Sequence, residues 1–213
     1  MKNKPLTDLL PSLVAAGIIT TVFSASSATN MIHRYSFNEP VGSTTVTDSI
    51  RGSNGVVRST PTGTLPTFDG SQVTLDGVGG YIDLPNRMLS GLTNVTFEFW
   101  TTYASGGTWS RILDFGIAAA GEDTNGTLVV GTPASNYVFM CFEPGPRFAI
   151  TPLSNGNENQ VNSGTAVAPG SVEHHFVVTY GPARTPSMYL DGNFVGSGNF
   201  VTPLSAITND VNC

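Results

Sequence analysis

Three aromatic residues adjoin predicted loops and have the chemistry that sugar binding requires: Tyr103, Trp109 and Tyr137. A pyranose ring has an apolar face and a rim of hydroxyls, so proteins bind it with a flat aromatic side chain beside planar polar groups. Packing in the core or on the surface is the alternative role for each ring. We predict these three residues as candidates for ligand binding.

Oxygen-bearing side chains gather in one glycine-rich segment, Asp48-Ser-Ile-Arg-Gly-Ser-Asn54-Gly55. Calcium is bound by oxygen atoms of Asp, Asn and loop carbonyls. Asp and Asn also close turns by accepting hydrogen bonds from nearby backbone N–H groups. Asp48 and Asn54 therefore have two interpretations, as calcium ligands or as turn-forming residues.

The carboxylates and nucleophiles form no recognised catalytic pattern. A glycosidase needs two carboxylates about 5 to 9 Å apart across the scissile bond. Glu98 has no second carboxylate two or four positions away, so we interpret it as a solvent-facing strand residue. The Gly-x-Ser-x-Gly elbow of serine hydrolases is also absent from the sequence. We expect no enzymatic activity; a glycoside hydrolase with an unrecognised carboxylate pair is the alternative.

Zinc binding is not expected from the three histidines, His33, His174 and His175. Neighbouring residues of a strand point to opposite faces, so His174 and His175 cannot hold one ion together. We expect packing or hydrogen bonding from them.

The candidate residues would be positioned by β-strands. Short runs that suit a pleated surface recur along the chain and are closed by turn residues, as is typical of an all-β sandwich. In the clearest strand, Asn94 to Thr102, Val95 and the alternating Phe residues face one way. The other predicted strands are 31–37, 72–75, 81–84, 111–115, 127–130, 137–142, 147–151, 174–180, 188–190 and 193–196.

Connections between these strands give further expectations. Asp191-Gly192 predicts a hairpin with a type I′ turn, because both residues tolerate positive φ. Strands 72–75 and 81–84 are predicted to pair, and 87–92 to form one short helical turn. Long polar loops at 42–54, 118–126 and 154–170 are where recognition sites usually lie on a rigid sandwich.

Composition agrees with this interpretation and excludes some partners. Charged residues make up only 11% of the chain, which has 24 Gly and 14 Pro. The net charge of −6 argues against binding nucleic acid, which requires a basic surface, and against anionic membranes.

The N-terminus has the pattern of a secretory signal peptide. Lys2 and Lys4 precede an apolar run that ends near Phe23, and small residues follow at Ser26 to Ala28. We predict removal of residues 1–28 and a secreted or cell-surface domain over residues 29–213, without stable membrane insertion after cleavage. An uncleaved N-terminal anchor is the alternative.

Two cysteines, Cys141 and Cys213, are too few for a disulfide framework. In an oxidising compartment they could form one bridge. Cys141 lies in an apolar run, however, and is more simply interpreted as a small buried hydrophobic residue.

Seven segments in order resemble the laminin G-like domains of the concanavalin A-like lectin/glucanase superfamily. The segments are 31–37, 48–55, 73–85, 95–100, 109–116, 173–180 and 188–192. The resemblance covers residues 31 to 212 and implies a two-sheet antiparallel jelly-roll sandwich. It also strengthens the calcium interpretation, since related domains often bind calcium through loop oxygens.

The sequence departs from the family pattern in two ways. Glucanases of the superfamily carry a Glu-x-Asp-x-x-Glu strand, and here only Glu98 is found on the corresponding kind of strand. The last strands of the family pattern are also missing, so we expect a C-terminally truncated domain in which 31–37 has an unpaired edge. Such an edge favours aggregation, and about thirty restored downstream residues should raise the melting temperature.

The function expected from these features is that of a noncatalytic binding or adhesion module. Its partner would be a glycan or an extracellular protein, with calcium as the one candidate cofactor. A structural spacer domain without a ligand is the remaining alternative.

Overall fold

The computed structural model describes residues 31–105, 107, 109–117, 135–142, 145–151, 158–164, 167–207 and 211–212. The predicted signal peptide, the predicted loop at 118–126 and the predicted strand at 127–130 lie outside these residues. Cys213 does as well, so its pairing with Cys141 stays a prediction.

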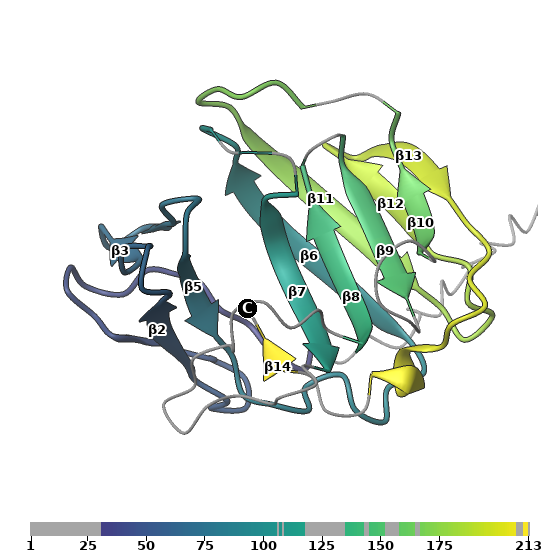
Figure 1. Cartoon of the computed structure of the whole chain (residues 1–213), viewed down its shortest axis with the longest axis horizontal. Helices are drawn as coiled ribbons and strands as arrows, with labels where there is room; N and C mark the ends of the chain where they lie inside the picture. The colour runs from purple at the N-terminus through teal and green to yellow at the C-terminus, as the bar shows by residue number, and fades with distance from the viewer. Residues whose placement is uncertain are drawn as a thin grey trace, which may run out of the picture. The chain divides into compact units, whose positions relative to one another are not determined.

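Two antiparallel sheets face each other and form the main body of the domain (Figure 1). The five-stranded sheet has the order β10-β9-β8-β7-β14, and the four-stranded sheet has the order β13-β12-β11-β6. The strands of the first sheet are β7 (Arg111–Ile117), β8 (Ser135–Cys141), β9 (Arg147–Thr151), β10 (Asn159–Asn162) and β14 (Val211–Asn212). Those of the second are β6 (Val95–Thr102), β11 (Glu173–Tyr180), β12 (Ser187–Leu190) and β13 (Asn193–Ser197).

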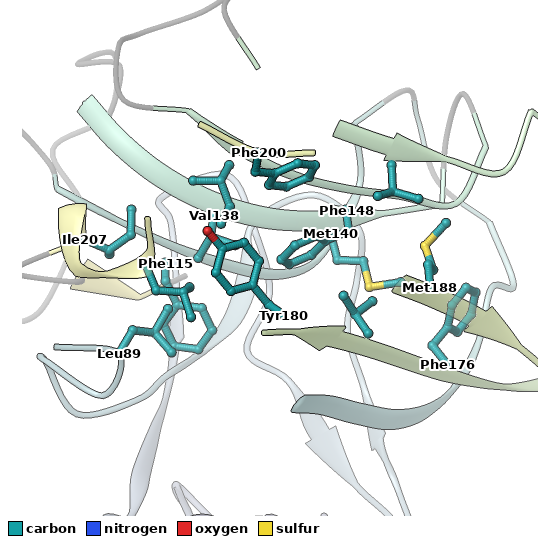
Figure 2. Close-up of a cluster of buried hydrophobic side chains, with 14 of the residues drawn as sticks. Leu89, Phe115, Val138, Met140, Phe148, Phe176, Tyr180, Met188, Phe200 and Ile207 are labelled. Carbon is teal, nitrogen blue, oxygen red and sulfur yellow. The ribbon is translucent and has the colours of Figure 1, made fainter. Parts of the chain in front are cut away.

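The core lies between these sheets because each strand alternates its side chains between two faces. Val138 and Met140 point inward from β8, and Phe176 and Val178 point inward from β11; all four are 0% exposed. Figure 2 shows Val138, Met140 and Phe176 gathered with Phe148, Tyr180 and others in one layer between the ribbons. Burial of this apolar area is the main stabilising contribution to the sandwich.

A smaller group of strands forms a second core near the N-terminal end of the described chain. The sheet β1-β2-β5 consists of β1 (Thr45–Val46), β2 (Gly55–Ser59) and β5 (Gly80–Asp83), beside the pair β3 (Thr67–Phe68) and β4 (Val73–Thr74). Val46, Val57 and Phe68 are buried together here. The one helical element among the described residues is the 3-10 turn η1 (Leu204–Ala206).

Several predictions from the sequence are confirmed. The chain folds as an all-β antiparallel sandwich, and β6 has the predicted alternation, with Phe97 and Phe99 packed against the core. Asp191 and Gly192 have φ values of 50° and 76° and join β12 to β13, as the hairpin prediction requires.

Other local predictions were wrong. Strand β4 pairs with β3, and β5 pairs with β2, so 72–75 and 81–84 do not pair with each other. The reason lies in the connecting turn, where the Asp76 carboxylate accepts hydrogen bonds from the N–H groups of Gly79 and Gly80 and from Thr64 of another loop.

The predicted strand at 31–37 is reduced to one bridge between Tyr35 and Asp48, and Phe37 has a φ of 53°, outside the extended region. Residues 87–92 form turns and no helix. The predicted loop at 154–170 contains strand β10.

Candidate functional site

The outer face of the five-stranded sheet, turned away from the core, carries aromatic and charged side chains. On β8 the residues that alternate with the core positions are Tyr137, Phe139 and Cys141. The register places Gly116, Asp114 and Arg111 of β7 opposite them. We call this surface the β7–β9 face and define it by Trp109, Arg111, Asp114, Tyr137, Phe139, Arg147 and Glu158.

Two arginines lie over aromatic rings on this face. The Arg111 guanidinium carbon is 3.6 Å from the centre of the Phe139 ring, and that of Arg147 is 4.6 Å from the centre of the Trp109 ring. A cation over the face of an aromatic ring is attracted by the ring quadrupole. Since Phe139 is 0% exposed, Arg111 rests on a rigid base.

Each arginine also pairs with a carboxylate. Arg111 Nε donates to Asp114 Oδ2 at 3.1 Å, and Arg147 Nη1 donates to Glu158 Oε2 at 3.4 Å. The Tyr137 hydroxyl donates to the other Glu158 oxygen at 3.2 Å. The four charged side chains therefore have a formal sum of zero.

Trp109 is the exposed aromatic residue of the β7–β9 face. Its relative exposure is 44%, and its ring meets that of Phe139 edge-on at 6.4 Å between centres. Its φ is 73°, a conformation that is uncommon for a bulky residue and costs free energy. Such strain persists only where the surroundings hold it, so Trp109 is placed by its contacts with the arginines below it.

Burial perturbs the titration of several groups on this face. Desolvation raises the pKa of Asp114 to about 6 even though Arg111 lies beside it. The pKa of the Tyr137 hydroxyl is also raised, by burial first and by the Glu158 carboxylate second. The buried Nε of Arg147 has no hydrogen-bond partner among the described residues.

The three aromatic residues predicted from the sequence lie in different places. Trp109 is exposed on the β7–β9 face, whereas Tyr137 of the same face is only 9% exposed and donates a hydrogen bond to Glu158. Tyr103 is 5% exposed and stacks on Phe142 in the core, with ring centres 4.7 Å apart. Its ring is covered by protein, so Tyr103 has the packing role that was its alternative.

Asp48 and Asn54 adopt the turn arrangement. The Asp48 carboxylate accepts backbone hydrogen bonds from Arg34, Ile50, Arg51 and Ser53. His33 Nδ1 lies 2.8 Å from it, and the Asn54 side-chain oxygen accepts from the Asp48 N–H. These bonds hold the pKa of Asp48 well below its usual range.

A calcium ion at Asp48 would have to displace several of these donors, so the residues present do not fit the ion. In the described part of the chain, no three His, Cys, Asp or Glu side chains group closely enough to hold a metal.

The outer face of the four-stranded sheet carries the second tryptophan. Trp100, 60% exposed, stacks on His175 with ring centres 4.4 Å apart. Glu98 is exposed and lies 3.0 Å from His175 Nε2, while His174 Nδ1 lies 2.8 Å from Asp191. The histidines act through hydrogen bonds, as expected, and Glu98 is solvent-facing.

Two open pockets of about 370 and 360 Å³ lie elsewhere in the domain. The first lies beside the β12–β13 hairpin, and the second lies near His33; neither includes Trp109. No helix in the described ranges has the length and apolar character needed to cross a bilayer.

The sequence that forms this face matches the model of a known protein family. The Laminin_G_3 family model, described as the concanavalin A-like lectin/glucanases superfamily, matches residues 76–212. The chain belongs to this superfamily. The laminin G-like resemblance seen in the sequence is confirmed, and the matched residues include the whole β7–β9 face of this superfamily member.

Solved structures similar to this superfamily member include an S-layer domain-containing protein (residues 221–444) from Clostridium thermocellum. It is 28% identical over 80% of this chain and 73% of that chain, with a TM-score of 0.44. The potassium-bound Emp46p carbohydrate recognition domain is 12% identical over 74% of this chain and 78% of that one, with a TM-score of 0.46. No curated protein matches the chain.

Sequence reasoning missed three charged residues of the β7–β9 face, Arg111, Arg147 and Glu158. A usable signal was present, because Arg111 and Arg147 each begin a predicted strand that otherwise consists mainly of apolar residues. A charged residue at the start of such a strand indicates a face that is not packed in the core. What the sequence lacked was the order of the strands.

Proposed function

We propose that this domain is a noncatalytic module that binds a neutral carbohydrate on the β7–β9 face. The observation that carries the proposal is the exposed Trp109 ring, held over Arg147 in a left-handed backbone conformation. A tryptophan ring can stack on the apolar face of a sugar, and the adjacent arginines and carboxylates can bind its hydroxyls.

Charge pairing on the β7–β9 face favours a neutral ligand. Arg111 and Arg147 are each matched by a carboxylate, so no charge is left to attract an ionic polymer. Such a mixed set of hydrogen-bond donors and acceptors suits hydroxyl groups, because a hydroxyl both donates and accepts hydrogen bonds.

The two tryptophans of the chain provide a matched test. Trp109→Ala should weaken binding of any glycan found on an array by at least about tenfold, since aromatic stacking and its apolar contact are removed. Trp100→Ala removes a more exposed tryptophan from the opposite sheet and should leave affinity unchanged. Calorimetric titration of both variants measures the difference.

A fluorescence experiment adds a direct readout of the site. In the Trp100→Phe variant, Trp109 is the sole tryptophan, so ligand binding should change its emission. Equal loss of affinity in Trp109→Ala and Trp100→Ala would contradict the proposed location. An array without glycan hits, together with recovery of a defined protein in pull-downs, would favour an extracellular protein as partner; recovery of neither would favour a spacer domain.

Glycoside hydrolysis is the second candidate, because a carboxyl group with a pKa of about 6 suits a general acid. Asp114 and Glu158 would be the pair, although each is held by an arginine that stabilises its ionised form. Release of reducing sugar that disappears in both Asp114→Asn and Glu158→Gln would support hydrolysis. Absence of release from a glycan that binds would support the noncatalytic module.

We also propose that the domain works outside the cell or at its surface. The basic and apolar pattern before Ala28 supports export. N-terminal sequencing of the protein recovered from the medium or the cell surface tests this, with cleavage after Ala28 as the expected result.

A further inference from the structure

The pocket of about 360 Å³ near His33 lies outside the β7–β9 face and has a different chemistry. Its walls come from residues 32–33, 51–53 and 85–92. Its volume falls at the lower end of the range of pockets that bind small molecules, about 300 to 1,000 Å³.

Two arginines, Arg51 and Arg87, line this pocket. Arg58, Arg111 and Arg147 each form an ion pair with a carboxylate. In the described part of the chain, the side chains of Arg51 and Arg87 have neither an ion pair nor a hydrogen bond. Two unmatched guanidinium groups in one pocket of a chain with a net charge of −6 point to an oxyanion, whose geometry the planar guanidinium matches.

His33 adds a third polar group with a fixed orientation. Its Nδ1 is 2.8 Å from the Asp48 carboxylate, which is 0% exposed. The Asp48 oxygens also accept hydrogen bonds from the backbone N–H groups of Arg34, Ile50 and Ser53. These donors, besides His33, stabilise the negative charge of Asp48. Within the described residues, His33 Nε2 has no partner.

The pocket is held in shape by Tyr35. Its hydroxyl donates to the Ser53 carbonyl at 2.6 Å and lies 3.9 Å from the Met88 sulfur, so it joins two of the three walls. Leu89 of the third segment is buried at 3% exposure in the main core. A pocket that is already formed loses little conformational entropy when a ligand enters.

Apolar side chains complete the walls, among them Ile32, Met88 and Leu92. We propose that this pocket binds an acidic saccharide, with its carboxylate or sulfate group between Arg51 and Arg87 and its ring against the apolar wall. The proposal does not depend on the neutral-sugar site at Trp109.

Calorimetric titration of the full chain with three probes tests the proposal: trigalacturonic acid, its methyl ester and a sulfated disaccharide. The carboxylate or the sulfate probe should bind, and added salt should weaken that binding because ionic interactions are screened. The probe that binds more tightly identifies the anion. The methyl ester, which has the same sugar rings but no charge, should not bind this pocket.

Variants locate the site. Arg51→Gln and Arg87→Gln should each lower the affinity for the anionic probe by about tenfold, the usual effect of losing one charge-assisted hydrogen bond. Arg34→Gln removes an exposed arginine next to His33 that does not line the pocket and serves as the matched control. Trp109→Ala should leave this affinity unchanged, which separates the result from the neutral-sugar site.

Three results would overturn the proposal: no binding of either anionic probe, equal binding of the methyl ester, or a loss in Arg51→Gln and Arg87→Gln no greater than in Arg34→Gln. Unfolding midpoints equal to that of the wild type show that any loss of binding comes from the pocket.

Discussion

At the residue scale, Asp48 shows how one buried carboxylate organises a surface turn. Its oxygens accept hydrogen bonds from backbone N–H groups on two segments, including Arg34 and Ile50, and contact His33. The Asp48 side chain is 0% exposed, so its carboxylate is in contact with these protein donors and not with solvent. Asp48 therefore supports the wall of the acidic-saccharide pocket without touching its ligand.

Replacement of Asp48 by Ala should lower the free energy of unfolding by about 3 kcal/mol, because several backbone donors in the turn lose one shared, charged acceptor. Urea denaturation monitored by fluorescence measures the change. Asp69→Ala is the matched control, since the Asp69 carboxylate also closes a turn, with Ser71 and Gln72, but at an exposed position. A midpoint for Asp48→Ala equal to that of Asp69→Ala would contradict this role.

At the element scale, the β2–β3 and β4–β5 connections are packed backbone to backbone. A Cβ atom added to Gly63 would lie 2.5 Å from both the Cα and the carbonyl carbon of Gly79. The Thr60 N–H donates to the Gly79 carbonyl at 2.9 Å, so the two loops cannot separate without losing this bond. This contact holds the two connections together, while β4 pairs with β3 and β5 pairs with β2.

Gly63→Ala should therefore destabilise the domain by about 1 to 3 kcal/mol, the usual cost of forcing a group into packed structure. Gly170→Ala is the control, because a Cβ at Gly170 meets nothing within 4 Å. Thermal unfolding followed by circular dichroism compares the two variants. Equal melting temperatures would show that the loops can separate at little cost.

At the scale of the whole molecule, the carboxylates make stability depend on pH in two opposite ways. The pKa values of Asp48 and Asp76 are lowered by hydrogen bonds, so their contribution is lost as pH falls below the usual range of Asp. The pKa of Asp114 is raised from 3.8 to about 6, so the folded state holds this proton more tightly than the unfolded chain does.

Stability should consequently fall as pH rises from about 4 to about 6, by at most about 3 kcal/mol from Asp114. Asp114→Asn should remove this fall, because the variant has no proton to lose there. Urea denaturation at a series of pH values measures it. Asp191→Asn is the control. Because the pKa of Asp191 is lowered, the contribution of Asp191 to stability is lost only as pH falls below the usual range of Asp. An unchanged slope in Asp114→Asn would refute the assignment.

The sequence by itself determined which side chains share a face of each strand. The two-residue period placed Phe97 and Phe99 in the core and left Glu98 and Trp100 in solvent, as the structure has them. It also determined the Asp191-Gly192 turn, because positive φ is a local property of those residues. These features depend on neighbours along the chain, and the sequence shows such neighbours directly.

Only the tertiary structure decided which outward-facing side chains meet. Trp109 precedes β7 and Arg147 begins β9. These two residues meet because folding places both strands in one sheet, on either side of β8. The same folding buried Tyr103 against Phe142 and brought His33 and Arg51 to one pocket. The physical reason is that strand order results from the burial of all apolar faces together, whereas alternation results from the geometry of a single strand.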